Sequence, residues 1–283
     1  MDIYCITHKN LDFIEKLKLI PCGVGINKYP LNYIDESKGE NISEKNSSYG
    51  ELTFHYWFWK NKINEYANNS WFGFCHYRRF FIKNEFEKKI QNVNNKQGFI
   101  GKKLDIDDLK SMLINNPREE WKDKDVILCQ PIDLQKPKKM KIIKRGFSSL
   151  IRDPSILFDK KKCTIKLQFE MSHGYKNLIN AVNLLPENEK KDFKIYIETK
   201  TNLSPNCMFF SKNAKLVKNF YKSAFLWLEK CEKVFGLKST NEYGTQRMYN
   251  FLFERYLPYW FEKYSKVGFS PWIYYDLTKN KIE

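Results

Sequence analysis

Residues 49–81 read YGELTFHYWFWKNKINEYANNSWFGFCHYRRFF, and this stretch predicts a helix followed by a strand. The helix is predicted over Glu51 to Lys62 and carries four consecutive aromatic side chains, YWFW. The strand is predicted over Trp71 to Phe81, an apolar run that ends in His76-Tyr77-Arg78-Arg79. A continuous apolar run of this length is typical of a strand inside a sheet.

The end of this predicted strand is the first candidate for a functional site. Ligands of α/β proteins bind outside the carboxyl ends of the strands, and a planar guanidinium donates paired hydrogen bonds to a phosphate or carboxylate. His76, Arg78 and Arg79 are therefore candidate ligands for an anion. The alternative is a solvated basic edge at which the strand ends, since most charge clusters are solvated surfaces.

The length allows one large α/β domain or two small ones, and a single domain is the simpler interpretation. The chain has 283 residues, 42% of them hydrophobic, and shows no repeat, linker or change of composition. Aromatic residues make up 16%, which we interpret first as core packing. The net charge of +16 predicts attraction to nucleotides, nucleic acid or an acidic membrane surface without choosing among them. An AT-rich coding sequence would also explain part of the lysine excess.

The cysteines predict neither a zinc site nor a disulfide framework. All seven are isolated, no CxxC pair occurs, and the number is odd. Cys5, Cys75 and Cys129 lie in apolar runs, where a free thiol packs as a small hydrophobic group. The sequence shows no signal-peptide pattern and no apolar run of membrane-spanning length. A cytoplasmic protein is expected, with at most peripheral contact at the inner face of the membrane.

The first strand end and a polar loop offer further candidate ligands. Asp2 to Thr7 is predicted as a strand, followed by a helix over Leu11 to Leu19. Pro21 to Gly25 lacks the spacing of a dinucleotide fingerprint and is predicted as a turn. Residues 35–50 are polar and fit either a surface linker or a ligand-binding loop. The side chains of interest here are Thr7, His8, Lys9, Asn41, Ser43, Lys45, Asn46 and Lys60, although the helix dipole alone would explain Lys60.

The chain after residue 100 predicts several helices and two short strands. Asp125 to Gln130 is predicted as a buried strand, and Ser204 to Phe210 as a strand with Asn206 at its entrance. The basic run Lys136 to Lys144 is interpreted as a solvated loop, with anionic lipid or nucleic acid as alternative contacts. The helices are predicted over Leu104–Asn115, Tyr175–Leu185, Lys215–Val234 and Glu242–Phe261, the last broken or kinked at Pro258.

Two residues before the helix at Tyr175 are candidates for proton transfer. Glu170 and His173 offer a carboxylate and an imidazole near a predicted helix start, which is one arrangement of a general base and its partner. An ordinary cap and surface pair would have the same appearance in a sequence.

At this point the motifs resemble a known family. Asn41 to Asn61 reads NISEKNSSYGELTFHYWFWKN, and it is followed by GFCHYRRFF at Gly73 to Phe81. These blocks resemble the capsular and exopolysaccharide glycosyltransferases long described as a domain of unknown function. The resemblance extends from about Tyr4 to Tyr264 and is looser after Asn206.

This resemblance implies a GT-A-like fold, with a Rossmann-type mixed sheet flanked by helices in a single domain. Residues 1–135 would mainly bind a nucleotide-sugar donor and residues 136–283 mainly the acceptor. The implied reaction moves a sugar, expected to be a hexose from a UDP-sugar, to a saccharide or lipid-linked saccharide in surface polysaccharide synthesis. Carried over, Thr7, His8 and Lys9 would line the nucleoside pocket, with the 41–46 loop beside it and Asn206 facing the sugar or the acceptor.

The sequence departs from many GT-A enzymes in one respect. Their Asp-x-Asp metal motif is absent where His76, Arg78 and Arg79 stand. Two arginines can stabilise a departing diphosphate without a metal, so metal-independent transfer is expected. Mn²⁺ or Mg²⁺ held by His76 and an acid elsewhere is the alternative. Glu170 and His173 are the candidate bases if transfer inverts configuration.

Three other functions are compatible with parts of the sequence. A nucleic-acid-binding protein would explain the charge, but the chain contains no recognised nucleic-acid motif. A viral glycosyltransferase that modifies DNA bases would combine both properties. A relative that binds sugar nucleotides without turnover is the third.

Overall fold

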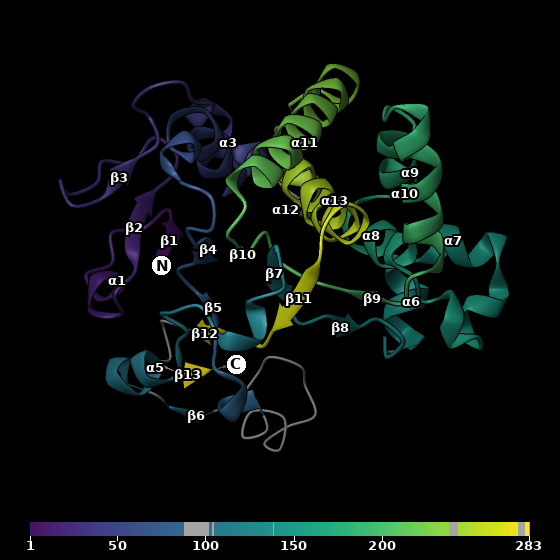
Figure 1. Cartoon of the computed structure of the whole chain (residues 1–283). Coiled ribbons are helices and arrows are strands. Elements are labelled where there is room, and N and C mark those ends of the chain that lie inside the picture. The colour runs from purple at the N-terminus through teal and green to yellow at the C-terminus, as the bar shows by residue number, and fades with distance from the viewer. Residues whose placement is uncertain (88–101, 104, 138, 238–242, 277–280, 283) are drawn as a thin grey trace.

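A central mixed sheet runs through the molecule, with helices on both of its faces (Figure 1). The computed structural model describes residues 1–87, 102–103, 105–137, 139–237, 243–276 and 281–282. The α/β class with a Rossmann-type mixed sheet, predicted from the sequence, is confirmed.

Seven strands form the main part of the sheet. They are β1 (Asp2–Thr7), β2 (Ile20–Gly23), β3 (Ile34–Asp35), β4 (Phe72–His76), β7 (Val126–Cys129), β10 (Phe209–Ser211) and β11 (Val267–Ser270). Their order is β3-β2-β1-β4-β10-β7-β11, and only β10 runs antiparallel to its neighbours within this series. The first four strands thus have the order 3-2-1-4 of a Rossmann half, which positions a ligand site at the carboxyl ends of β1 and β4.

The remaining strands extend the sheet from β4. They are β5 (Arg79–Phe81), β12 (Trp272–Asp276), β13 (Lys281–Ile282) and β6 (Lys102–Lys103), in the order β4-β5-β12-β13-β6. The single strand predicted over Trp71 to Phe81 is therefore wrong: the chain reverses at Tyr77-Arg78, and His76 pairs with Arg79. No glycine, asparagine or proline marks this turn in the sequence. A separate pair joins β8 (Ile132–Asp133) to β9 (Asn202–Leu203).

The core lies on both faces of the sheet because alternate strand residues point to opposite sides. On β1, Tyr4 and Ile6 pack with one cluster, whereas Ile3 and Cys5 pack with the other. The first face is covered by α3 (Leu52–Asn61), α11 (Ala214–Phe235) and α13 (Met248–Tyr264), and the second by α1 (Phe13–Lys16) and α5 (Ile106–Met112). Aromatic rings of both layers interlock, as the composition predicts; the Tyr4 and Phe58 rings, for example, meet edge to face at 5.1 Å.

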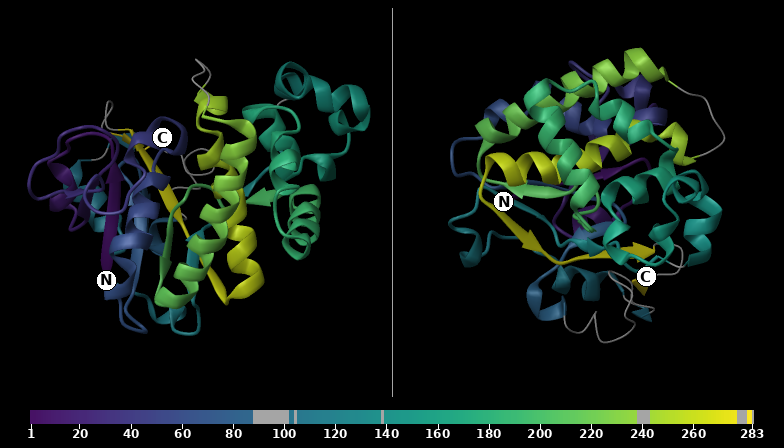
Figure 2. Two further views of the ribbon diagram at one scale, coloured as in Figure 1. Left: turned by 90° about the horizontal axis from the view of Figure 1, so that it is seen from above. Right: turned by 90° about the vertical axis from the view of Figure 1, so that its right-hand side faces the viewer.

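A group of helices stands at one end of the sheet, beside α13 (Figure 2). It comprises α6 (Lys139–Arg145), α7 (Phe147–Arg152), α8 (Ile165–His173), α9 (Asn177–Val182) and α10 (Glu187–Thr199). The other short elements are α2 (Asn46–Tyr49), α12 (Tyr243–Gln246) and the 3₁₀ turns η1 (Ser43–Lys45), η2 (Ile63–Glu65), η3 (Glu119–Trp121), η4 (Pro154–Leu157) and η5 (Lys160–Lys162). Within the described ranges, no helix has the length and apolar character of a membrane span.

Four local predictions need correction. Pro21 to Gly25 is not simply a turn, because Ile20–Gly23 forms strand β2, paired with β1. The basic run predicted as a loop contains α6, because Ile142 is buried against the neighbouring helices. Glu170 and His173 belong to a helix of their own, α8, which Thr164 caps and which ends before α9 begins. Helix α13 continues past Pro258, which is buried within it, so the helix is not broken there. The seven cysteines are all free and buried, as expected.

Candidate functional site

The candidate site lies where β1 and β4 end side by side. These parallel strands are paired so that Ile6 is opposite His76. Thr7 is completely buried, and its hydroxyl accepts a hydrogen bond from the Lys9 amide at 2.9 Å. This turn makes Thr7 a structural residue and leaves the His8 and Lys9 side chains exposed at the strand end.

Arg78 occupies the tight turn that follows β4. Its guanidinium carbon lies 5.0 Å from the centre of the Tyr77 ring, and Nη1 donates a hydrogen bond to the Tyr274 hydroxyl at 3.3 Å. Its Nε is buried and has no hydrogen-bond partner among the described residues. A buried donor without a partner is costly, so a ligand acceptor at this position would stabilise the arrangement.

Tyr274 on β12 orients both arginines of the turn. It is paired with Arg79 in the antiparallel ladder between β5 and β12. The guanidinium carbons of Arg78 and Arg79 lie 5.6 and 5.5 Å from the centre of its ring. Stacking on an aromatic face fixes a guanidinium while leaving its N–H groups free to donate.

A third arginine reaches the same place from the other half of the chain. Arg247 precedes α13, and its Nη1 lies 3.4 Å from the position that a Cβ on Gly50 would occupy. Gly50 has a φ of 57° and separates α2 from α3. The glycine thus both permits the turn and leaves room for this approach.

The pKa values of His76 and His8 are lowered, in part because several positive charges lie close to both rings. Burial lowers the pKa of His76, and the charges of Arg79 and Arg78, with smaller contributions from His8 and Arg247, lower it further. The pKa of His8 is also lowered, by partial desolvation of the ring and by the charges of Arg247, Lys9 and Arg78. Both imidazoles are therefore neutral near pH 7, and the positive charge of the site comes from its arginines and Lys9.

Glu51 provides a carboxyl group within this basic cluster. It precedes the first turn of α3, and its Oε2 lies 3.7 Å from Nε2 of His76. Burial raises the pKa of Glu51, and the positive charge of Arg79 opposes that shift. A carboxyl of raised pKa beside a neutral imidazole is suited to exchange a proton with a ligand.

Asn206 closes the site from the start of β10. Its backbone is left-handed, with a φ of 69°, and its amide donates a hydrogen bond to Oε1 of Glu254 at 2.6 Å. Glu254 also pairs with the buried Arg255, whose Nη2 donates to Oε1 of Gln168 at 2.6 Å. The Asn206 side-chain Nδ2 is buried and has no hydrogen-bond partner in the described part of the chain. Burial raises the pKa of the Cys129 thiol at the end of β7, and the nearby Asn206 side chain opposes that rise.

A buried acid organises the end of β2. Glu36 is completely buried and accepts a hydrogen bond from the Gly25 amide at 2.8 Å. Burial raises its pKa to about 7. Asn46 lies beside Gly25 and donates to the Gly50 carbonyl at 2.8 Å. Asn46 therefore connects the β2 end to the turn that admits Arg247.

Four side chains predicted to bind the sugar-nucleotide donor form contacts within the protein instead, in the 35–50 loop or between this loop and a helix. Asn41 Oδ1 accepts a hydrogen bond from the Ser43 hydroxyl at 2.8 Å. Lys45 forms an ion pair with Glu232 on α11 at 2.7 Å, and Lys60 forms one with Glu40 at 2.8 Å. These contacts occupy the groups that the sequence offers to a ligand.

The structure does not bring Glu170 and His173 together as a base and its partner. Glu170 accepts a hydrogen bond from the Ser149 hydroxyl at 2.6 Å, within the group of helices. His173 stacks on Phe251 and places Nδ1 3.2 Å from the Gly244 carbonyl oxygen. Burial lowers the pKa of His173 to about 3, so it is neutral throughout the physiological range.

The donor atoms of the site fit an anion better than a resident divalent cation. Glu51 and His76 are the pair that would contact a metal, and the guanidinium groups around them would repel it unless a diphosphate lay between. In the described part of the chain, no three His, Cys, Asp or Glu side chains are grouped closely enough to hold a metal ion.

The chain resembles known proteins in sequence and in fold. A family model described as Domain of unknown function (DUF4422) matches residues 2–266. The chain belongs to this family. Among solved structures, it is similar to the apo structure of the bifunctional glycosyltransferase WbbM, with a TM-score of 0.61 and 18% identity. The match covers 97% of this chain and 45% of that one, so the chain spans less than half of the WbbM structure. The sequence matches no curated protein.

The family match agrees with the resemblance found in the sequence, and the likeness to WbbM concerns the fold. Three site residues were not among the sequence candidates: Glu51, Arg247 and Tyr274. Glu51 stands in the most specific motif, so its position before an aromatic helix was a usable signal. No comparable signal marks Tyr274 in the sequence, because only the pairing of β12 with β5 brings Tyr274 to the arginines.

Proposed function

We propose that this chain transfers a sugar from a nucleoside diphosphate sugar, with the diphosphate bound by Arg78, Arg79 and Arg247. The observation that carries the proposal is the convergence of three guanidinium groups at the ends of β1 and β4, where the buried Nε of Arg78 has no partner among the described residues. A phosphate group supplies the acceptors that such donors need. The similarity of the fold to a glycosyltransferase supports the same choice of ligand.

The reaction requires stabilisation of a leaving group. The bond between the anomeric carbon and the phosphate oxygen breaks, and the nucleoside diphosphate leaves with the electron pair. A bond forms from an acceptor hydroxyl oxygen to the anomeric carbon, and the hydroxyl proton passes to a base. Preorganised donors that contact developing negative charge lower the barrier, and loss of one such donor typically lowers kcat by about 100- to 1000-fold.

Glu51 is the base that we propose for the acceptor hydroxyl. It contacts His76 and borders the arginines, so its carboxylate would lie beside the bound diphosphate sugar. Burial raises its pKa towards neutral pH, and a general base is most effective when its pKa lies near the working pH. Glu254 borders the same cluster, but its two oxygens already bind the Asn206 amide and Arg255.

The finer assignments come from the resemblance to polysaccharide glycosyltransferases. We propose a UDP-hexose as donor and a saccharide, free or lipid-linked, as acceptor in surface polysaccharide synthesis. We also propose that transfer does not require a metal, because the guanidinium groups supply positive charge where a cation would otherwise be needed. His8 and Lys9, exposed at the end of β1, are the proposed contacts of the nucleoside.

A turnover assay with a panel of nucleoside diphosphate sugars tests this proposal. The release of nucleoside diphosphate is measured with Mn²⁺ and with a chelator, for the parent chain, Arg79→Ala and the control Lys60→Ala. Turnover that survives the chelator, falls about 100-fold in Arg79→Ala and persists in the control is expected. Absence of turnover with every donor, or an unchanged rate in Arg79→Ala, would overturn the proposal.

A further inference from the structure

Helices α6 and α7 carry two apolar stripes on opposite faces. The inward stripe consists of Ile142, Gly146 and Ser149, which are buried against the rest of the helical group. The outward stripe consists of Met140, Ile143, Phe147 and Ile151, spaced three, four and four residues apart. A helix of a globular protein normally needs only the first kind of stripe, so the core does not explain the second.

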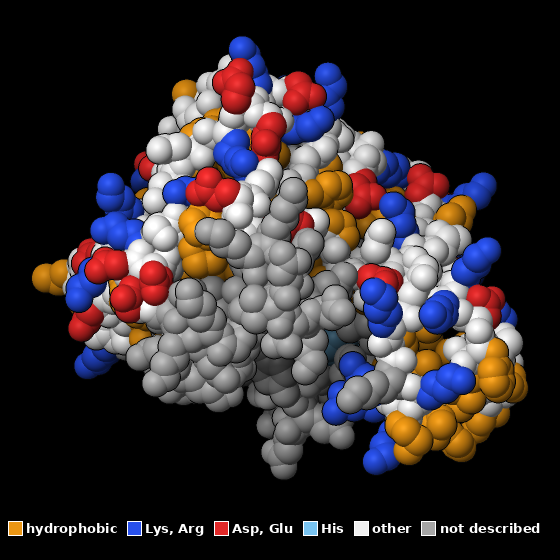
Figure 3. Space-filling model, turned by 90° about the horizontal axis from the view of Figure 1, so that it is seen from below, with side chains coloured by type: hydrophobic (Ala, Val, Ile, Leu, Met, Phe, Trp, Pro, Cys, Tyr) orange, Lys and Arg blue, Asp and Glu red, His pale blue; other side chains and the backbone are white. Residues whose placement is uncertain are grey.

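The outward stripe is strongly exposed. The exposed fractions of Met140, Phe147 and Ile151 are 59%, 59% and 66%, and that of Ile143 is 38%. Phe158, which follows η4, is 79% exposed, and its ring centre lies 5.3 Å from Nζ of Lys139 on α6. These five apolar residues therefore belong to one face, which we call the α6–α7 surface. Figure 3 shows hydrophobic side chains gathered beside Lys and Arg side chains at the right-hand end of the molecule.

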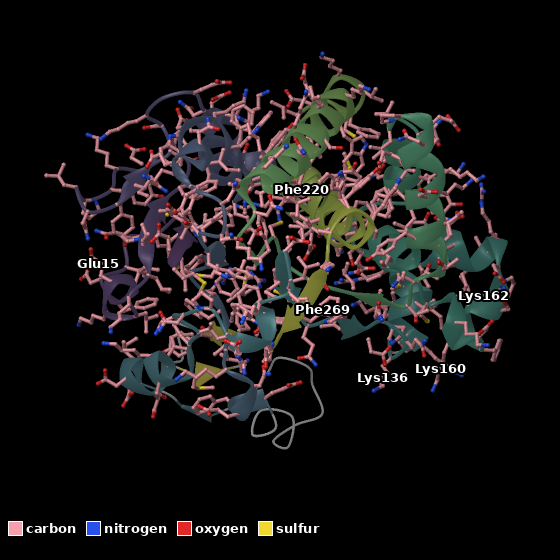
Figure 4. All side chains as sticks on the ribbon, viewed as in Figure 1. Glu15, Lys136, Lys160, Lys162, Phe220 and Phe269 are labelled. Carbon is pink, nitrogen blue, oxygen red and sulfur yellow. The ribbon has the colours of Figure 1, made fainter. Side chains whose placement is uncertain are left out.

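Basic residues surround these apolar side chains. Residues 136–162 contain ten Lys and Arg and two Asp, a net charge of +8 out of +16 for the whole chain. One of the two acids, Asp153, already pairs with Lys162 at 2.6 Å. Lys136, Lys160 and Lys162 lie at the outer edge of the helical group in Figure 4. The segment that carries this apolar face thus accounts for half of the net charge of the chain.

The positive charge and the apolar side chains of this surface together indicate which partner it binds. A second copy of the chain, bound through the same face, would bring +8 against +8, and like charges at an interface are costly. Nucleic acid would satisfy the lysines, but three of the five apolar residues of this surface are aliphatic and offer no ring for stacking on bases. An anionic bilayer satisfies both features, because its headgroups attract lysine and its acyl boundary accepts short apolar side chains.

We propose that the α6–α7 surface binds the chain peripherally to an anionic lipid bilayer. Met140, Ile143, Phe147, Ile151 and Phe158 enter the boundary between headgroups and acyl chains, and the surrounding lysines contact the anionic headgroups. This inference does not depend on the proposed sugar transfer.

Vesicle co-sedimentation of the full chain tests the proposal. Vesicles of phosphatidylcholine alone are compared with vesicles that also contain phosphatidylglycerol, at low and high salt. Binding to the anionic vesicles that weakens with salt is expected, with little binding to the neutral ones. Replacing two exposed lysines, in Lys141→Gln/Lys144→Gln, should weaken partitioning about 30-fold, at about fivefold for each lysine.

The apolar part of the surface has its own variant and controls. Phe147→Ser/Ile151→Ser should weaken partitioning by about tenfold or more, since burial of these side chains is lost. Leu226→Ser/Val234→Ser and Lys222→Gln/Lys230→Gln, at exposed positions on α11, serve as matched controls and should bind as the parent does. Thermal unfolding confirms that each variant is folded.

Three results would overturn the proposal. The first is equal binding to neutral and anionic vesicles. The second is binding that the α6–α7 variants and the α11 controls reduce alike. The third is binding of duplex or single-stranded oligonucleotides that the same lysine replacements abolish, with no vesicle binding by the parent chain.

Discussion

Replacing Glu36 by glutamine should change how the stability of the fold depends on pH. Glu36 directly follows β3 and is buried beside the end of β2, where it accepts a hydrogen bond from the Gly25 amide. Burial raises its pKa from 4.5 to about 7. Between these two values the folded chain binds more protons at this group than the unfolded chain does. The free energy of unfolding must therefore fall as the pH rises through this window.

The size of the effect follows from the two pKa values. One proton changes the free energy of unfolding by up to about 1.4 kcal/mol for each pH unit, so the whole window accounts for at most about 3 kcal/mol. Glutamine keeps the acceptor oxygen for Gly25 and carries no charge. Glu36→Gln should thus match the parent near pH 4 and exceed its stability above pH 7, by roughly 6 to 12 °C in Tm at the upper limit.

Chemical and thermal unfolding at a series of pH values measures this directly. The parent, Glu36→Gln and the control Glu119→Gln are compared, the control being a carboxyl that is 90% exposed. The control should follow the parent at every pH. A difference between Glu36→Gln and the parent that stays constant from pH 4 to pH 8 would refute the buried, protonated carboxyl and with it the described order of the β2 end.

Three further outcomes are expected. Glu51→Gln should lower kcat by about 100-fold or more while UDP affinity stays unchanged or improves, because a base is lost and an anion is removed from beside the phosphates; a proportional loss of affinity would contradict the role of base. Tyr274→Phe should weaken UDP binding about fivefold through loss of one hydrogen bond to Arg78, and an unchanged Kd in titration calorimetry would contradict the orienting role. Gly73→Ala should lower Tm by about 5 °C or more, since its Cβ would lie 2.0 Å from a ring carbon of Phe210, and a Tm equal to that of the parent would contradict the close approach of β4 and β10.

The sequence predicted the elements whose side chains are apolar throughout. Strands β1, β4 and β7 were recognisable because both of their faces are buried. Helix α11 was recognisable because its apolar residues recur at helical spacing. Such patterns depend only on which residues within one segment are buried. The order of apolar and polar residues in that segment is sufficient to predict this.

The candidate site was only partly predictable, because long-range pairing assembles it. Arg78 and Arg79 were found from their position after an apolar run, yet the turn between β4 and β5 was missed for lack of a turn residue. Arg247 is separated from them by most of the chain and reaches them only because α13 packs beside α2. No local pattern encodes such a contact.

Several candidate residues from the sequence have partners within the fold. Asn41, Lys45 and Lys60 carry groups that bind ligands in other proteins, but a folded chain also uses these groups for its own turns and ion pairs. His173 is buried between aromatic rings, where burial keeps it neutral. Residue type alone does not distinguish these uses, whereas the partner of each polar atom does.

Titration calorimetry of UDP tests the central claim most directly. The parent chain, Arg78→Ala and Lys60→Ala are titrated in the presence of a chelator. Lys60 is the control because it lies near the end of α3, nine residues after Glu51, and is paired with Glu40. Loss of a hydrogen-bonding cation at a phosphate should weaken binding by about 10- to 100-fold in Arg78→Ala, and the Lys60→Ala affinity should equal that of the parent. Equal affinity of the parent and Arg78→Ala for UDP, or binding that requires Mn²⁺, would contradict a diphosphate site built from arginines.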